Sequence, residues 1–182
     1  GVTVTRNLTI PLDDGRVLQV GTPADLSQRP QTIQAANFMR CGNLLRAETL
    51  EISGEYASIV CRQGWRFACS ADRLTPAMRD KPDGLTVVVR PEYIELAPSG
   101  EDTSAADSKT RIGEVEIMEV ADHGATVHFL VDSEHERDKP LQVILGRREA
   151  ERLDFHAGDR ASAMVDPRHI HLLEAFHESV PD

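Results

Sequence analysis

A series of short runs rich in β-branched and other apolar residues, separated by turn residues, is the feature that most constrains the fold. Runs of this length and spacing are typical of the strands of a small barrel or sandwich. Aromatic residues make up only 4% of the chain, so Val, Ile, Leu and Ala must supply most of the core. The expected strands cover residues 44–52, 56–61, 65–69, 86–89, 93–96, 113–120, 126–131, 141–145, 161–165 and 169–172.

A small, polar and acidic segment divides this β region. Residues 98–110 (PSGEDTSAADSKT) cannot bury apolar area, which predicts a mobile loop between two lobes at about 44–97 and 111–175. Short helices are expected at about 71–79 and 146–153. The sequence carries no repeat strong enough to establish that the lobes are duplicates. The C-terminal tail, residues 176–182, is predicted to be frayed.

The first 42 residues have a different character. Two β-like runs, 2–11 and 16–20, flank an Asp-Asp-Gly turn and predict a hairpin. Thr22 and Pro23 then suit the start of a short helix. A second helix is expected over 31–40, and a start at Gly rather than Met predicts that the natural protein extends upstream.

The balance of charge excludes some partners. The chain has 30 acidic and 20 basic residues and a formal net charge of -10. A field of that sign repels phosphate backbones and anionic membrane surfaces, so no nucleic-acid partner is expected. No apolar run approaches the ~20 residues that a membrane-spanning helix needs.

Several blocks of the sequence, taken in order, are similar to one family. Gly15–Pro23 resembles a G-x-x-x-Q-x-G-T-P stretch, and Leu26–Pro30 resembles an L-Y-x-x-P stretch with Ser27 in place of the aromatic residue. Further blocks follow at Ala36–Leu44, Val88–Ile94, Gly113–Val115, Gly158–Arg160, Val165–Pro167 and His169–His171. Together they resemble the C-terminal part of the ATP-binding subunits of ABC importers. The block Arg90-Pro91-Glu92 is similar to the R-P-E motif of their accessory domain, named TOBE for transport-associated OB.

This resemblance implies a mainly β fold: an OB-like small barrel or sandwich of two lobes with a few short helices. Residues 1–42 would be the tail of the nucleotide-binding domain, a hairpin plus two helices, and residues 43–175 the TOBE domain. The family-motif positions, expected to be structural or to lie at an interface, are Gly21, Thr22, Pro23, Arg90, Pro91 and Glu92.

Catalytic machinery is not expected in this chain. No G-x-x-x-x-G-K-[ST] loop is present to hold nucleotide phosphates, so we expect no catalytic residue, nucleotide site or cofactor here. By the resemblance, ATP and Mg²⁺ belong to a motor domain encoded ahead of Gly1. The implied partners are that domain, a second copy in a homodimer, and transmembrane permease subunits. The implied place is the cytoplasmic face of the membrane, peripherally bound. The transported solute, the dimer patch and any regulator remain open.

Other local patterns carry weaker interpretations. Cys61 and Cys69 flank a predicted turn and could pair, although reduced thiols are favoured. His169 and His171 would share a strand face, but two histidines do not complete a zinc site, so we expect no metal. Asp122-His123 and Ser133 lack the context of a hydrolase nucleophile.

Two functions therefore compete at this point. The first is a non-catalytic regulatory and dimerisation domain of an importer ATP-binding subunit, with one patch meeting itself across a two-fold axis. The second is a small-ligand or oxyanion-binding OB-like domain, for which backbone amides and a few hydroxyls suffice. In the plainest interpretation, Pro91 only breaks a strand while Arg90 and Glu92 face the same side.

Overall fold

Burial alternates along most of the strands, which curl into two sheets so that one face of each is covered. The structure, a computed structural model, describes residues 8–11, 17–21, 42–100, 109–133 and 140–174. Strand β4 shows the alternation well: Ala57, Ile59 and Cys61 are buried, and the residues between them are more exposed. Such a period of two is what a pleated strand over a core requires.

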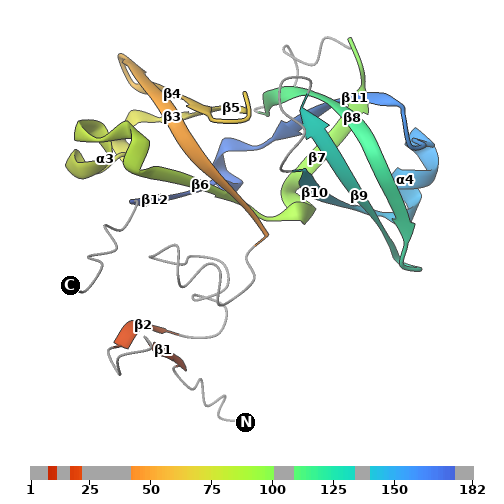
Figure 1. Ribbon diagram of the computed structural model, residues 1–182, viewed down its shortest axis with the longest axis horizontal. Helices are drawn as coiled ribbons and strands as arrows, with labels where there is room; N and C mark the ends of the chain where they lie inside the picture. Colours follow the sequence, from red (N-terminus) through yellow and green to blue (C-terminus); the bar gives the residue numbers. More distant parts are fainter. Residues whose placement is uncertain (1–7, 12–16, 22–41, 101–108, 134–139, 175–182) are drawn as a thin grey trace.

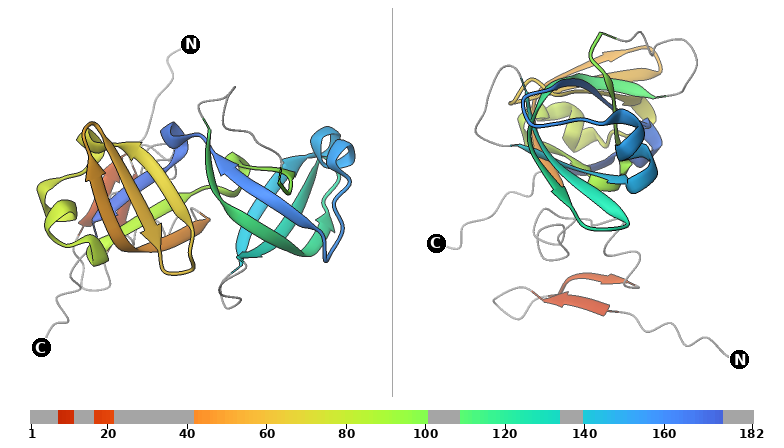
Figure 2. Two further views of the ribbon diagram at one scale, coloured as in Figure 1. Left: turned by 90° about the horizontal axis from the view of Figure 1, so that it is seen from above. Right: turned by 90° about the vertical axis from the view of Figure 1, so that its right-hand side faces the viewer.

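The architecture is two antiparallel five-stranded sheets lying side by side (Figure 1). The first sheet has the order β12-β6-β3-β4-β5 and the second the order β10-β9-β8-β11-β7. Their strands are β3 (Asn43–Ser53), β4 (Tyr56–Cys61), β5 (Arg66–Ser70), β6 (Leu85–Val89), β7 (Ile94–Pro98), β8 (Thr110–Asp122), β9 (Thr126–Ser133), β10 (Leu141–Gly146), β11 (Arg160–Val165) and β12 (His171–Glu174). Figure 2 shows each sheet curled into a half-barrel. The mainly β, two-lobed, OB-like prediction is thus confirmed.

A separate two-stranded hairpin precedes the lobes. Strands β1 (Leu8–Pro11) and β2 (Val17–Gly21) pair antiparallel, as the sequence predicted. The helices predicted within residues 22–40 lie outside the described residues, as do residues 101–108 of the predicted loop and the tail 176–182. The proposed domain boundary at residue 42 therefore stays a prediction.

The fifth strand of each sheet is the strand that follows, in the sequence, the fourth strand of the other sheet. Strand β7 follows β6 in the sequence but pairs with β11 in the second sheet. Strand β12 follows β11 but returns to pair with β6 in the first sheet. The expectation of contiguous lobes, 44–97 and 111–175, is therefore wrong, because strand pairing depends on contacts between distant segments that periodicity does not report.

The two lobes repeat one pattern, which the sequence alone did not establish. Each begins with a hairpin, β3–β4 or β8–β9, whose turn contains a glycine with positive φ, Gly54 or Gly124. Each hairpin also carries a bulge in the same place, after Ala47 in the first lobe and after Ile117 in the second. A third strand, a short helical segment and a fourth strand follow in both.

Short helices cover the connection between the third and fourth strand of each lobe. In the first lobe these are η1 (Ala71–Arg73), α3 (Pro76–Asp80) and η2 (Pro82–Gly84), and in the second lobe α4 (Arg147–Leu153). The hydroxyl of Thr75 caps α3 by accepting from the Met78 N–H at 3.3 Å. Both helical predictions are confirmed. Within the described residues, no helix has the length and apolar composition needed to cross a bilayer.

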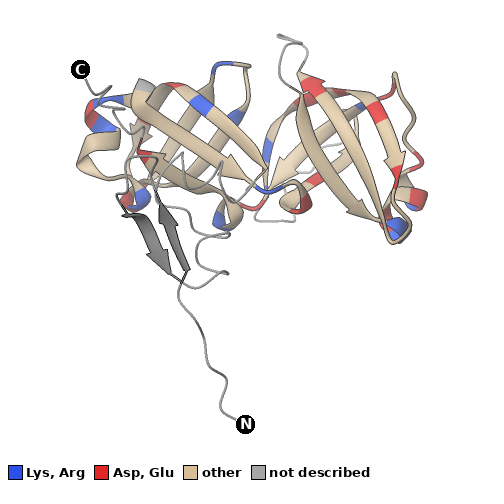
Figure 3. Cartoon of the chain, turned by 60° about the horizontal axis from the view of Figure 1, so that its bottom comes forward, with Lys and Arg blue, Asp and Glu red and all other residues tan. Residues whose placement is uncertain are grey.

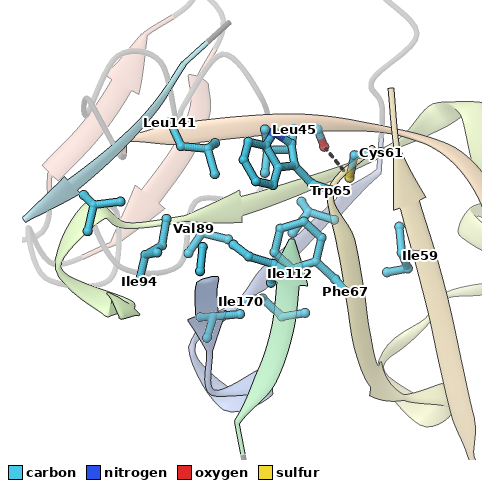
Figure 4. Close-up of a cluster of buried hydrophobic side chains, with 14 of the residues drawn as sticks. Leu45, Ile59, Cys61, Trp65, Phe67, Val89, Ile94, Ile112, Leu141 and Ile170 are labelled. Carbon is cyan, nitrogen blue, oxygen red and sulfur yellow. Dashed lines mark hydrogen bonds between the residues drawn. The ribbon is translucent and has the colours of Figure 1, made fainter. Parts of the chain in front are cut away.

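A single hydrophobic cluster runs through both lobes. Figure 4 shows Trp65 and Phe67 of the first lobe together with Ile112 and Leu141 of the second. Trp65 and Phe67 are each 1% exposed, and Ile112 is likewise 1% exposed. Because the cluster is continuous, the lobes share one core rather than two independent ones.

Cys61 and Cys69 are free, buried thiols on neighbouring strands. In the strand register Cys69 lies opposite Ala57, so the two cysteines do not face each other. The Cys61 thiol donates to the Leu45 carbonyl at 3.9 Å (Figure 4). Burial raises the pKa of Cys61 to about 12 and also raises the pKa of Cys69. The cross-strand disulfide considered from the sequence is absent from the structure.

These thiols should therefore be unreactive in the folded protein. In a Cys41→Ser background, a thiol reagent at pH 8 should modify neither cysteine until denaturant unfolds the chain, because thiolates are the reactive form. Burial also raises these pKa values above their unfolded values, so the free energy of unfolding should fall as the pH rises from about 9 toward about 12. Rapid labelling under native conditions, followed by mass spectrometry, would contradict this view of the core.

Candidate functional site

The two connections that exchange the fifth strands form the most distinctive local structure. Each passes from a fourth strand into a 3-10 turn that opens with proline: η3 (Pro91–Tyr93) and η4 (Pro167–His169). The residue before each proline, Arg90 or Asp166, is extended, as the proline ring requires. Proline also fixes its own φ, so both turns leave the sheet in a set direction.

The residues directly before and after each proline form an ion pair, and the order of the two charges is reversed between the two turns. Arg90 Nε lies 2.6 Å from Glu92 Oε1, and Arg168 Nη2 lies 2.7 Å from Asp166 Oδ2. Asp166 also accepts the Arg168 backbone N–H at 2.9 Å. The side-chain bond from Arg168, followed by its backbone N–H, lowers the pKa of Asp166 to about 2. The Arg90–Glu92 pair is open to solvent, and pairs of that kind contribute only ~0–1 kcal/mol, so its main effect is on the shape of the turn. Asp166, by contrast, is 8% exposed, so its pair with Arg168 is shielded on the carboxylate side.

The last residues of the two turns stack on each other. The rings of Tyr93 and His169 have centroids 4.2 Å apart and planes 15° from parallel. Both residues occupy the same place in their turns, so the stack lies where the two repeats meet. Arg73 supports it from η1 by donating to the carbonyls of Pro167, at 2.7 Å, and Ile170, at 2.5 Å.

A shallow recess of about 660 Å³ lies beside this stack. Its cationic groups are already engaged, since Arg73 binds two backbone carbonyls and Arg168 pairs with Asp166. The residues that line it are Ser70, Arg73, Tyr93, Pro167, Arg168, His169, Ile170 and His171. The recess therefore offers mostly groups whose hydrogen-bonding capacity is used within the protein.

Gly42 packs closely against Pro91. Gly42 has φ +95°, and a Cβ atom placed on it would lie 2.5 Å from Pro91 Cδ and 3.4 Å from the Val89 carbonyl oxygen. Only glycine adopts that φ freely and leaves room for the proline ring. Gly42 therefore has a structural role at the crossover, through its close contact with Pro91.

The structure brings some of the predicted site residues together and leaves others apart. Gly21 ends β2 opposite Leu8, while Thr22 and Pro23 lie outside the described residues. Arg90, Pro91 and Glu92 stand together at the crossover, in a turn rather than a strand.

The weaker candidates do not assemble into a site. His169 lies in η4 and His171 starts β12, so the expected shared strand face is wrong because η4 intervenes. Asp122 and Ser133 lie at opposite ends of the β8–β9 hairpin, opposite Val127 and Val115. In the described ranges, no three His, Cys, Asp or Glu side chains group in a way that could hold a metal ion.

Sequence reasoning missed half of this crossover. The second turn, with Asp166, Arg168 and His169, was assigned only to closing strands, and Arg73 received no role. A signal was present: valine, a charged residue, proline, an oppositely charged residue, an aromatic ring and isoleucine occur in that order at both crossovers. The two blocks are Val89–Ile94 and Val165–Ile170.

Comparisons with known proteins place this architecture in a class. Residues 87–173 match the family model for the TOBE domain. The spermidine/putrescine import ATP-binding protein PotA of Nostoc sp. is 35% identical over 86 residues, which cover 47% of this chain and 22% of that protein. The maltose/maltodextrin import ATP-binding protein MalK of Vibrio vulnificus is 26% identical over 170 residues, which cover 92% of this chain and 40% of that protein.

A solved structure shares the fold. The cytoplasmic molybdate-binding protein ModG, with molybdate bound, superposes with a TM-score of 0.51 at 15% identity, covering 71% of this chain and 94% of ModG. At that identity the likeness shows the fold alone. The match of residues 87–173 and the similarity to the C-terminal region of importer ATP-binding subunits support a TOBE-type accessory domain, and the lobes have an OB-like fold. This chain aligns with only about a fifth to two fifths of the length of such relatives (22% of PotA, 40% of MalK).

Replacing Gly42 should destabilise the crossover. In Gly42→Ala the new Cβ collides with Pro91 and the backbone is held at a positive φ, so we expect a loss of about 3 kcal/mol. Thermal unfolding should show a midpoint lower by roughly 6–12 °C for a chain of this size. The matched control is Gly54→Ala, which has φ +60° but open space around it and should cost only about 1 kcal/mol. Equal losses at the two sites would show that contact with Pro91 is unimportant.

Because of the Asp166 carboxylate, the free energy of unfolding should decrease at acidic pH. Its pKa is depressed to about 2 in the folded chain, so its contribution is complete above the ordinary value near 3.8 and is lost as the pH falls toward about 2. Denaturant titrations between pH 2 and 5 should show a weaker pH dependence for Asp166→Asn than for the parent chain. Asp154→Asn, at an exposed position, serves as the control. A pH profile unchanged by Asp166→Asn would contradict the assigned ion pair.

Proposed function

We propose that this domain belongs to the ATP-binding subunit of an importer and acts there as a non-catalytic scaffold that joins two copies of the subunit. ATP and Mg²⁺ would be bound by a motor domain outside these 182 residues, and the permease subunits would contact the complex through that motor. The complex would lie at the cytoplasmic face of the membrane as a peripheral assembly. Regulation of the motor through this scaffold is part of the proposal.

The observation that carries this proposal is the similarity to importer ATP-binding subunits across both lobes. The alignment with MalK runs over 170 residues, which includes much more than the 87–173 segment matched by the family model. The relatives that match are named for several cargoes: polyamines for PotA, xylose or arabinose for XacJ of Haloferax volcanii, and maltodextrins for MalK. The accessory domain is thus common to importers of different solutes, which favours a mechanical role over recognition of one cargo.

The fold suits a scaffold because the lobes cannot move independently without breaking strand pairs. Each lobe is completed by a strand whose connection crosses from the other lobe, and both crossovers are held by proline turns. The lobes also share one hydrophobic cluster. A rigid body of this kind can keep two motors at a fixed separation while the motors open and close.

The tip of the β3–β4 hairpin, which exposes an apolar side chain on each face, is the best candidate for the contact between copies. Tyr56 is 71% exposed and Ile52 is 43% exposed, although both are large apolar side chains. The strand register pairs Ile52 with Ala57 and Ser53 with Tyr56, so both side chains lie at the hairpin tip but on opposite faces of the two-stranded ribbon. Tyrosine in particular is enriched at interfaces, and a self-complementary patch suits a two-fold dimer.

Charge does not provide a second obvious surface. Figure 3 shows basic and acidic residues on both lobes rather than in one stripe of a single sign. With a net charge of -10, two copies repel each other at long range. An apolar contact is therefore the more favourable way for the copies to associate, and higher salt should strengthen the association.

Oxyanion binding is the second candidate, and the likeness of the fold to a molybdate-binding protein is what favours it. The recess beside Tyr93 is lined by two arginines, but these bind carbonyls and a carboxylate of this chain. An oxyanion would have to displace those bonds. Calorimetric titration with molybdate, sulfate and phosphate distinguishes the candidates, since saturable heat at micromolar anion would favour the second.

The proposed contact predicts a specific loss of dimerisation. In the double variant Ile52→Lys, Tyr56→Lys the tips acquire like charges, and the dimer dissociation constant measured by sedimentation equilibrium should rise at least about tenfold. Met118→Lys, Val120→Lys is the matched control, because those side chains are 41% and 39% exposed on β8 of the other lobe. A parent chain that stays monomeric at all concentrations, or a control that dissociates equally, would overturn the assignment.

A further inference from the structure

The two lobes differ in what covers the outer edge of their third strand, which is β5 in the first lobe and β10 in the second. In the second lobe the edge of β10 is closed by the side chain of Asn43. The Asn43 carboxamide nitrogen donates to the Gln142 carbonyl at 2.9 Å, and its oxygen accepts the Gln142 N–H at 2.8 Å. A single planar amide thus satisfies both backbone groups of one edge residue.

In the first lobe the residue in the corresponding position is Arg66 on β5. Residues of an antiparallel pair alternate between those that exchange backbone hydrogen bonds and those whose N–H and C=O point outward. The Cys61 N–H donates to the Trp65 carbonyl at 2.8 Å, so the next pair, Val60 with Arg66, is of the outward kind. Among the described strands, β5 is the last of its sheet, so the Arg66 backbone groups face away from β4, the strand that pairs with β5.

Within the described residues, the position equivalent to Asn43 supplies no asparagine to this second edge. Counted along the two hairpins, with their equivalent bulges, Asn43 corresponds to Gly113. Gly113 has no side chain, and a Cβ atom there would lie only 3.2 Å from the Trp65 ring. The pairing of β8 with β11 also contains an extra residue, Ile112, whereas β3 pairs with β6 without such a bulge.

A recess of about 260 Å³ occupies the place beside Arg66 and Gly113. At the ~30 Å³ that a water molecule takes in the liquid, this is room for about nine waters or one small organic solute. The residues that line the recess are Gly64, Trp65, Arg66, Arg111, Ile112, Gly113, Glu114 and Ser133. Figure 4 shows two of them, Trp65 and Ile112, within the apolar cluster, so one wall is hydrophobic.

The charges around the recess favour a solute with an anionic end. Arg66 and Arg111 both border it and both are exposed. Its one carboxylate, Glu114, is engaged by Arg111 and by the hydroxyls of Ser99 and Ser162. A bound carboxylate would thus meet the guanidinium of Arg66 and would share that of Arg111 with Glu114.

We propose that this recess binds a small solute that carries a primary carboxamide and a carboxylate, a class to which free glutamine belongs. The carboxamide oxygen accepts the Arg66 N–H, and its nitrogen donates to the Arg66 carbonyl, repeating the contact of Asn43 with Gln142. The carboxylate lies near the guanidinium groups of Arg66 and Arg111, and the chain between them lies along the recess beside Gly113. This site goes beyond the scaffold role and does not rest on it.

The probe is L-glutamine, titrated into the uniformly ¹⁵N-labelled 182-residue chain. We expect saturable shifts of the backbone amide signals of Gly64, Arg66 and Gly113. L-Glutamate should bind at least about tenfold more weakly, because its carboxylate cannot donate to the Arg66 carbonyl. Absence of saturable shifts up to the solubility limit of glutamine, or equal affinity for glutamate, would overturn the proposal. Shifts confined to signals remote from Arg66 would do the same.

Two variants locate the site, with one matched control. Gly113→Asn places a carboxamide where the solute would bind, and Arg111→Gln removes a guanidinium without adding bulk. Both should weaken the binding of glutamine at least about tenfold. The control is Gly124→Asn, at a hairpin tip with open space and a φ of +85°, and it should bind as the parent does. If Gly113→Asn fails to fold against Trp65, Arg111→Gln decides alone. Unchanged affinity in Arg111→Gln would then count against the site.

Discussion

The exchange of fifth strands is the constraint on which the rest of the structure depends. Strand β7 completes the second sheet by pairing with β11, and β12 completes the first by pairing with β6. Without these partners β6 and β11 would become edge strands with open rows of backbone donors and acceptors. Neither lobe can therefore form its complete sheet from a contiguous segment, and the two lobes must fold as one unit. The continuous hydrophobic cluster is a consequence of this exchange, since the crossing segments carry buried Val89, Ile94 and Ile170 between the lobes.

Two short turns, rather than long linkers, make this exchange possible. Pro91 and Pro167 direct the chain out of one sheet and into the other, and Gly42 leaves room for the first of them. The Arg90–Glu92 pair adds little free energy because it is exposed to water, whereas the carboxylate of the Asp166–Arg168 pair is buried. The ring stack of Tyr93 with His169 holds the turns against each other. The mechanical coupling between the lobes therefore depends on sterics and backbone geometry, which salt and small pH changes affect little.

The sequence predicted most of the strands but not their partners. Periods of two and turn residues located the hairpins and both helical segments, because these depend on neighbours along the chain. The exchange of β7 and β12 and the contact of Arg73 with Pro167 join distant segments, and local patterns carry no record of them. The R-P-E block was identified because it resembles a family motif. Its counterpart at Asp166 was overlooked because the reversed charges conceal the repeat, although proline and the flanking apolar residues preserve it. The recess beside Arg66 could not be predicted at all, because it arises from a missing side chain at Gly113.

Differences between the repeated lobes indicate where this domain does more than fold. If stability were the only requirement, both lobes could have the same kind of contact at each equivalent position. The β3–β4 tip instead carries exposed Ile52 and Tyr56, whereas the equivalent β8–β9 tip has Asp122, which pairs with Arg147. One edge is closed by Asn43, and the other is left with a recess beside Arg66. Exposing apolar groups or leaving an edge without an amide partner costs free energy, so such departures from the repeat are best explained by contacts that a second molecule supplies. Both differences lie on the first lobe or on the side of the second lobe that faces it. We therefore expect partners of this domain to bind mainly to the first lobe, although the two lobes have similar folds.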